Sequence, residues 1–298
     1  ATPPGIVALT EEWTGAGAPI GAWATGGNLN TARQSLGGAG ASSIAALAFG
    51  GGPPGVAITE SYDGTSWTAV NNMNTGRAFL GGTGTQTAAL AFGGEGPPIS
   101  TATEVWNGTN WATSPGTLNT ARNLMAESGT STSALAFGGE GPPNLAVTES
   151  WNGTSWTNVN DLNTARRNYS GSGASNTEGL AIGGYVTTNI ASVESYNGTN
   201  WTEVGDINTA RRGTGASGTP SSTIVFGGYS TAASALTEDW NGATWAEVAD
   251  LTTARAGLAA ASQSTTSSVT FGGNNPSPVT AATEEWSSSS NVVKTLTD

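Results

Sequence analysis

One arginine and one glutamate recur in almost every segment of about 45 residues, and such side chains could grip an anionic ligand or pair with each other. The arginines end the motif Thr-Ala-Arg or a variant, and they are Arg33, Arg77, Arg122, Arg166, Arg211 and Arg255. The glutamates stand two residues before an aromatic residue, and they are Glu60, Glu104, Glu149, Glu194 and Glu238. Strand alternation places each glutamate on a face with apolar neighbours, where an unpaired carboxylate is costly. We therefore expect structural ion pairs that join neighbouring units of the fold.

Two further patterns could carry chemistry. Aromatic residues five apart, such as Trp106 and Trp111, could stack on sugars, but their recurrence in each repeat favours packing between units. Two adjacent glutamate pairs, Glu11-Glu12 and Glu284-Glu285, stand out as carboxylates for acid–base catalysis. Neither pair is convincing as a catalytic site, so we expect a protein that is not an enzyme.

Composition narrows the function further. The chain has 298 residues with no Cys and no His, which removes thiol nucleophiles, imidazole bases and the usual zinc and copper ligands. We expect no cofactor and no metal. The formal net charge is −12, which disfavours nucleic acid and anionic membrane surfaces as partners. No apolar stretch is long enough to span a membrane, so membrane insertion is not expected.

Three markers share one period and predict the architecture. The arginines are spaced by 44, 45, 44, 45 and 44 residues. Gly-Gly pairs with the same period begin at Gly50, Gly93, Gly138, Gly183, Gly227 and Gly272. The third marker, an aromatic residue after Thr-Glu-x or a variant, falls at Trp13, Tyr62, Trp106, Trp151, Tyr196, Trp240 and Trp286. A four-strand unit repeated at this period predicts an all-β protein, a β-propeller with four-stranded antiparallel blades.

Each period contains signals for four short strands. A segment rich in small residues follows the arginine and suits the crowded axis. An apolar run ending in Gly-Gly suits a strand buried on both faces, and an alternating strand with the glutamate comes next. An Asn-Gly or Asp-Gly dipeptide then predicts a tight hairpin in which both central residues have positive φ, before the last strand with the second aromatic.

The markers differ in the number of blades that they indicate. Six arginines and six Gly-Gly pairs indicate six blades, while seven copies of the aromatic marker leave seven as the alternative. We expect one domain over residues 1–298, with N-terminal strands at about 6–25 closing the ring against the last blade. One terminal copy is then displaced or extra. The last strand of that blade could otherwise come from "NVVKTLT" near the C-terminus.

The repeats resemble the kelch type of β-propeller. Gly-Gly after an apolar run, an aromatic before Asp-Gly or Asn-Gly, and a following Trp carry this resemblance, as in "FGGGPPGVAITESYDGTSW" from Phe49 to Trp67. Some kelch propellers are copper oxidases that use His, Tyr and Cys, and this chain lacks His and Cys. In its Gly-, Thr- and Asn-rich composition the chain also resembles the regular kelch-like repeat proteins of marine bacteriophage virions.

The loops after the Gly-Gly pairs differ most between repeats, and variable loops on a rigid frame are where recognition usually occurs. The candidate binding residues in them are Glu95, Glu140, Tyr185, Tyr229, Asn274 and Asn275. We expect a non-catalytic protein displayed on a virion or cell exterior, which binds a surface glycan or protein through these loops. The alternative is a purely structural virion component, a decoration or connector that packs against other virion proteins or copies of itself.

Overall fold

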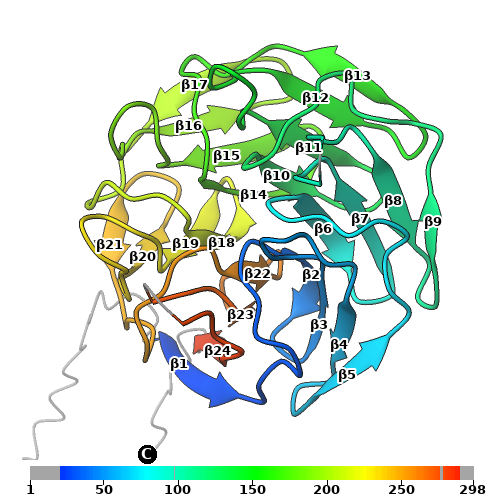
Figure 1. Cartoon of the computed structure of the whole chain (residues 1–298). Coiled ribbons are helices and arrows are strands. Elements are labelled where there is room, and N and C mark those ends of the chain that lie inside the picture. Colours follow the sequence, from blue (N-terminus) through cyan, green and yellow to red (C-terminus); the bar gives the residue numbers. More distant parts are fainter. Residues whose placement is uncertain (1–20, 97, 276–277, 289–298) are drawn as a thin grey trace, which may run out of the picture.

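The computed structural model describes residues 21–96, 98–275 and 278–288, and these residues form β-strands and no helix. The strands make six antiparallel sheets of four strands each. The sheets stand around a central axis as the blades of a disc (Figure 1). The fold is therefore a six-bladed β-propeller, which confirms six blades over the alternative of seven.

Blades 1 to 5 use four consecutive strands each, from β2–β5 to β18–β21, and blade 6 uses β22, β23, β24 and β1. The innermost strands are β2 (Gly37–Ser42), β6 (Gly81–Thr85), β10 (Ala126–Gly129), β14 (Ser170–Ser175), β18 (Gly215–Thr219) and β22 (Ala259–Ala261). The second strands are β3 (Ala45–Phe49), β7 (Ala88–Phe92), β11 (Ala134–Phe137), β15 (Glu178–Ile182), β19 (Ser222–Phe226) and β23 (Ser267–Phe271). Small residues at the axis let the six innermost strands converge.

The outer half of each blade carries the aromatic pairs. The third strands are β4 (Thr59–Tyr62), β8 (Thr103–Trp106), β12 (Thr148–Trp151), β16 (Val193–Tyr196), β20 (Thr237–Trp240) and β24 (Thr283–Ser288). The outermost strands are β5 (Trp67–Val70), β9 (Trp111–Thr113), β13 (Trp156–Val159), β17 (Trp201–Val204), β21 (Trp245–Glu247) and β1 (Gly21–Gly26). In each blade, one aromatic residue of the third strand lies opposite one of the outermost strand, as Trp106 lies opposite Trp111.

The ring closes in blade 6, where the first described strand of the chain completes the last sheet. Strand β1 pairs antiparallel with β24 and places Trp23 opposite Trp286, in the same relation as the aromatic pairs of the other blades. Trp23 also donates a hydrogen bond from Nε1 to Oγ1 of Thr237 in blade 5, at 3.0 Å. Residues 6–20 of the expected closing segment, the first aromatic marker at Trp13 and the segment "NVVKTLT" lie outside the described residues.

The hydrophobic core lies between the blades. Phe49 of blade 1 packs on Trp111 of blade 2 with ring centroids 4.9 Å apart, and both are buried. Nε1 of Trp111 donates to Oγ1 of Thr59, again in the preceding blade, at 3.0 Å. An outermost Trp bonds to the preceding blade in all six seams, and where Val193 replaces the threonine, Trp245 bonds to the Gly205 carbonyl at 2.8 Å instead.

The hairpins between the third and fourth strands differ from the prediction. The loop between Trp106 and Trp111 has four residues, and only Gly108 has positive φ, at 92°. The Oδ1 of Asn107 accepts hydrogen bonds from the backbone N–H of Thr109 at 3.0 Å and of Asn110 at 2.8 Å. The prediction of a two-residue turn with two positive φ values was thus wrong, because the asparagine side chain closes a wider loop by itself.

Candidate functional site

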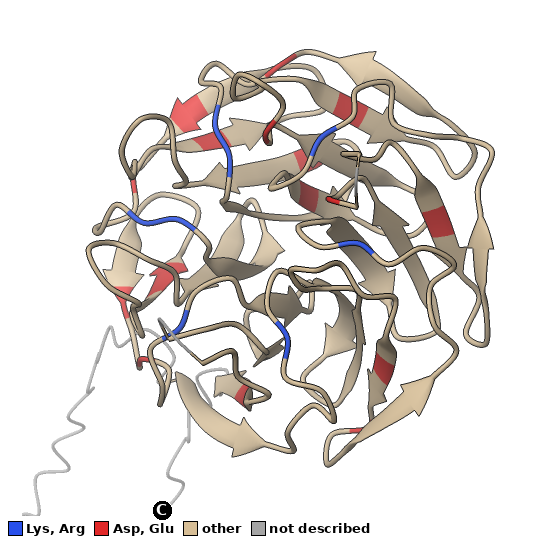
Figure 2. Cartoon of the chain, viewed as in Figure 1, with Lys and Arg blue, Asp and Glu red and all other residues tan. Residues whose placement is uncertain are grey.

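The six repeated arginines are buried and paired with glutamates. Figure 2 shows the segments that carry them arranged around the axis. In blade 5, Nη2 of Arg211 lies 2.9 Å from Oε1 of Glu238, and Nη1 donates to the carbonyls of Gly227 and Leu236. The equivalent pairs are Arg33–Glu60, Arg77–Glu104, Arg122–Glu149, Arg166–Glu194 and Arg255–Glu284. Burial lowers the pKa of the Arg211 guanidinium, and the charge of Glu238 opposes that shift.

The second carboxylate oxygen of each glutamate is bound by the backbone at the first position of the Asn-Thr-Ala-Arg motif. The backbone N–H of Asn208 donates to Oε2 of Glu238 at 2.6 Å. The same bond comes from the residue three positions before each other arginine, that is Asn30, Asn74, Asn119, Asn163 and Thr252. The glutamates are therefore saturated on both oxygens, and their arginine partners are not available to a ligand.

Each of these arginines connects two blades. The carbonyl of Arg211 accepts the N–H of Gly184, in blade 4, at 2.9 Å, while its side chain bonds within blade 5.

The glutamate of the last pair, Glu284, was absent from the sequence-derived set because it stood out as half of a carboxylate pair. Its neighbour Glu285 instead accepts a hydrogen bond from the Tyr62 hydroxyl at 2.5 Å. The other adjacent pair, Glu11-Glu12, lies outside the described residues.

The candidate binding residues occupy equivalent positions on one face of the disc, which we call the loop face. It carries the loops after the second strands and the connections into the innermost strands. Five candidates each form an isolated bridge with the residue after a repeated arginine, and they are Glu95, Glu140, Tyr185, Tyr229 and Asn274. Asn275 follows and is exposed. The five bridge-forming residues come from consecutive blades, with Glu140, Tyr185 and Tyr229 in blades 3, 4 and 5, flanked by Glu95 in blade 2 and Asn274 in blade 6.

Two further arginines join Glu140 and the two tyrosines, and the sequence reasoning missed both. The guanidinium carbon of Arg212 lies 4.7 Å from the ring centroid of Tyr185 and 5.1 Å from that of Tyr229. Arg167 lies 5.3 Å from the Tyr185 ring and forms an ion pair with Glu140. We call these five residues the Arg–Tyr patch. The signal in the sequence was the doubled arginine of "TARR", which occurs only in the repeats that lead into blades 4 and 5.

The Arg–Tyr patch is held in place by the loops around it. The amide of Asn144 donates to the carbonyls of Tyr185 and Val186, and that of Asn189 donates to the carbonyls of Tyr229 and Ser230. Each asparagine thus binds the loop of the next blade. A hollow of about 280 Å³ is lined by Leu124, Glu140, Arg167, Asn168, Tyr185 and Arg212. The side chains of Arg167 and Glu140 are about one third exposed, so this ion pair, unlike the structural ones, is open to solvent.

The loop face also surrounds the mouth of an axial cavity. Six residues around the mouth bond in a closed circle, in which each backbone N–H donates to the carbonyl of the residue from the preceding blade at 2.8–3.0 Å. We call this circle the mouth ring, and its members are Ser35, Phe79, Leu124, Asn168, Gly213 and Gly257. All six have φ between 50° and 62°, the left-handed conformation that aligns these bonds.

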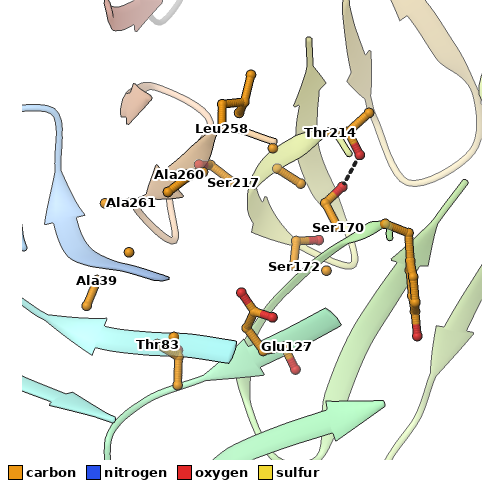
Figure 3. A pocket seen from close by; sticks show the side chains of 18 of the residues that line it. Ala39, Thr83, Glu127, Ser170, Ser172, Thr214, Ser217, Leu258, Ala260 and Ala261 are labelled. Carbon is orange, nitrogen blue, oxygen red and sulfur yellow. Dashed lines mark hydrogen bonds between the residues drawn. The ribbon is translucent and has the colours of Figure 1, made fainter. Parts of the chain in front are cut away.

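The axial cavity has a volume of about 150 Å³ and is lined by the innermost strands of all six blades. One carboxyl group, that of Glu127 on β10, reaches into it (Figure 3). Burial raises the pKa of Glu127 to about 8, and a hydrogen bond from the backbone N–H of Gly82 opposes that shift. Glu127 was not among the sequence-derived candidates, although every other innermost strand has Gly or Ala at this position.

Two general features bear on the kind of site. Among the residues that the structure describes, no three Asp or Glu side chains come together in a way that could hold a metal ion. Over the same residues, no helix has the length and apolarity that a membrane span requires.

Comparison with known proteins supports the fold. No protein-family model matches the chain, and no curated protein sequence matches it. The solved structure of YjhT is similar with a TM-score of 0.72 and 12% sequence identity, and the match covers 87% of this chain and 96% of that chain. At this identity the likeness concerns the path of the backbone alone. The chain therefore has the fold of a six-bladed β-propeller that is similar to YjhT.

Proposed function

We propose that this protein is a non-catalytic binding module that recognises a glycan or protein surface through its loop face. The support is a contrast within the chain itself. The buried pairs and inter-blade tryptophans repeat around the ring, while the positions on the loop face change from blade to blade. Residues that are the same in each blade stabilise the fold, and residues that vary between blades are available to bind a ligand.

One observation carries the proposal, and it is the position of Arg212 between the rings of Tyr185 and Tyr229. A guanidinium over aromatic rings keeps N–H groups at its edge that can donate. Among the described residues, the Arg212 side chain donates one long hydrogen bond, to Oδ1 of Asn189 at 3.3 Å. The tyrosines add aromatic surface and hydroxyl groups. Such a patch suits a hydroxyl-rich ligand that offers acceptors to arginine and C–H faces to the rings, as a glycan does.

The absence of catalysis and the place of display are parts of the same proposal. The sequence has no His or Cys, and the repeated glutamates are occupied by arginine and backbone donors. Glu127 is alone in the axial cavity, without the second carboxylate that acid–base hydrolysis uses. The kelch-like motifs and the resemblance to bacteriophage virion repeats support display on a virion or cell exterior.

A glycan array tests the proposal with variants that borrow residues from other blades. Arg212→Ala introduces the residue found at Ala78 and Ala256, and Tyr185→Asn introduces that of Asn274, so both are compatible with the frame. We expect both variants to lose binding while Ile44→Ala, at a residue 61% exposed on the opposite face, keeps it. Equal binding by all four proteins would contradict recognition through the Arg–Tyr patch.

A structural role in a particle is the second candidate. Within the described part of the chain, six outermost strands end their sheets and leave an edge at the rim where another chain can add a strand. They are β5, β9, β13, β17, β21 and β1. A pull-down against purified particle components separates the two functions. Association with particle proteins that survives Arg212→Ala, together with no binding on the array, supports the structural role.

A further inference from the structure

Glu127 breaks the repeat on the innermost strands, where the backbones of neighbouring blades come close together. The equivalent residues are Gly38, Gly82, Gly171, Ala216 and Ala260. A Cβ atom on Gly171 would lie 2.2 Å from the carbonyl oxygen of Glu127, and one on Gly38 would lie 2.4 Å from that of Ala260. This position therefore faces the neighbouring innermost strand and favours the smallest side chains. A glutamate here serves no packing need that the other five blades share.

The carboxyl of Glu127 has no cationic partner. Among the described residues it takes part in no ion pair, and the backbone N–H of Gly82 is a hydrogen-bond donor to it. The phenol of Tyr169, which interacts electrostatically with Glu127, donates to the Phe137 carbonyl at 2.6 Å and brings no positive charge. Because the ionised carboxylate is poorly solvated there, a cation arriving from outside the chain would shift the group toward its ionised form.

The walls of the axial cavity supply what a cation with N–H donors needs. Each innermost strand is bonded to a neighbour on one side only, so its other edge turns backbone carbonyl and N–H groups toward the axis. The side-chain amide of Gln263 donates to the Gly129 carbonyl at 2.6 Å, across from blade 6 to blade 3 at the far end. This bond crosses the end of the cavity opposite the mouth ring.

We propose that the axial cavity is a binding site for a small primary ammonium ion, with the Glu127 carboxylate as its counter-charge and backbone carbonyls as further acceptors. The group R–NH3⁺ offers three donors, and a cavity of about 150 Å³ admits a ligand of only a few heavy atoms. A divalent metal ion is a poorer fit, because such ions gather several carboxylate and carbonyl ligands. This site is separate from the Arg–Tyr patch and does not rest on the function proposed for it.

Binding releases a proton. The neutral carboxyl gives its proton to the solvent, and the resulting carboxylate pairs with the incoming R–NH3⁺, whose own charge and protons are unchanged. With the pKa of free Glu127 at about 8, roughly nine tenths of the sites hold that proton at pH 7. We therefore expect close to one proton released per ligand at pH 7, and an affinity about tenfold higher at pH 9 than at pH 7.

Calorimetric titration with methylammonium chloride tests this in two buffers of different ionisation enthalpy, which reports the released proton directly. Glu127→Gln keeps the shape of the side chain, and Glu127→Ala restores the residue of blades 5 and 6, so both should fold and lose binding. Glu178→Gln is the control, since Glu178 lies on β15 and its carboxylate caps the N–H of Ala174. The control should keep the affinity, the proton release and the pH dependence of the natural protein.

Four results would overturn the proposal: no binding of methylammonium, binding that survives both Glu127 variants, binding without proton release at pH 7, or equal affinity for tetramethylammonium, which has no N–H donor. Should the variants fail to fold, the carbon NMR shift of the Glu127 carboxyl in the natural protein decides. A change to the ionised form on adding methylammonium at pH 7 supports the site, and an unchanged shift rejects it.

Discussion

Nη2 of Arg211 lies 2.9 Å from Oε1 of Glu238, and neither side chain is more than 1% exposed. The next residue along the chain, Arg212, has its side chain on the loop face against two tyrosine rings. The two adjacent arginines thus lie in opposite environments. Arg211 is buried and paired with a glutamate, whereas Arg212 is partly exposed and lies against aromatic rings. The same division separates Arg166 from Arg167 in the preceding repeat.

We predict that Arg211→Ala lowers the free energy of unfolding by about 3–5 kcal/mol, because it leaves the Glu238 carboxylate buried without its counter-charge. Arg212→Ala should cost less than about 1 kcal/mol, as expected for a partly exposed cation. Denaturant unfolding of the two variants measures both values. Similar losses in the two variants would mean that the buried pair does not hold the seam.

The stability of the natural protein should depend on pH through Glu127. Burial raises the pKa of this carboxyl from 4.5 to about 8, so the folded state keeps the proton over a range where the unfolded state has lost it. The stabilisation from this group is complete below about pH 4.5 and disappears as the pH rises to about 8. Relative to Glu127→Ala, the natural protein should become steadily less stable across that window. Parallel pH profiles for the two proteins would contradict the raised pKa.

An alkaline transition is expected at the seam between blades 1 and 6. Burial, followed by the hydrogen bond to the Glu285 carboxylate, raises the pKa of Tyr62 from 10.0 to about 12. Because the folded state holds the phenol proton more tightly, this contribution is present below pH 10 and is lost between about pH 10 and 12. Tyr62→Phe should remove that loss, as measured by thermal unfolding across the range. Tyr196→Phe, at the equivalent position of blade 4, is the control, since its pKa is raised by burial alone.

The first glycine of each pair is expected to tolerate no side chain. A Cβ atom on Gly183 would lie 2.8 Å from the carbonyl oxygen of Arg211, which belongs to the connection into the next blade. Gly183→Ala should therefore destabilise by more than about 1 kcal/mol, beyond the effect of its φ of 62°. Gly153→Ala separates the two causes, since Gly153 also has positive φ, at 94°, but its Cβ would have 3.5 Å of space. A larger loss at Gly153 would show that backbone strain outweighs the clash.

Much of the fold could be predicted because the same sequence motifs recur in each blade. The period, the four strands and the pairing of Arg with Glu follow from residues that each blade must have, such as Arg122 and Glu149. The blade count was harder, since the two ends of the chain share one blade. Trp23 shows why: its strand precedes every other described strand, yet it completes the last sheet.

The functional candidates were harder to predict for the opposite reason. Arg167, Arg212 and Glu127 depart from the repeat, and attention to what recurs passes over them. A residue-by-residue comparison of the innermost strands would have isolated Glu127, because a carboxylate in place of Gly or Ala has no structural explanation. The environment that raises its pKa cannot be seen in the sequence, since it arises from six strands that meet at one axis.

The mouth ring sets how molecules reach that axis. Because its six bonds form a loop without ends, widening the opening at any point strains neighbours on both sides, and all six backbone donors are already used. We therefore expect the opening to keep a fixed width. A molecule that enters through the mouth ring then has to fit an opening whose width is held by these six hydrogen bonds.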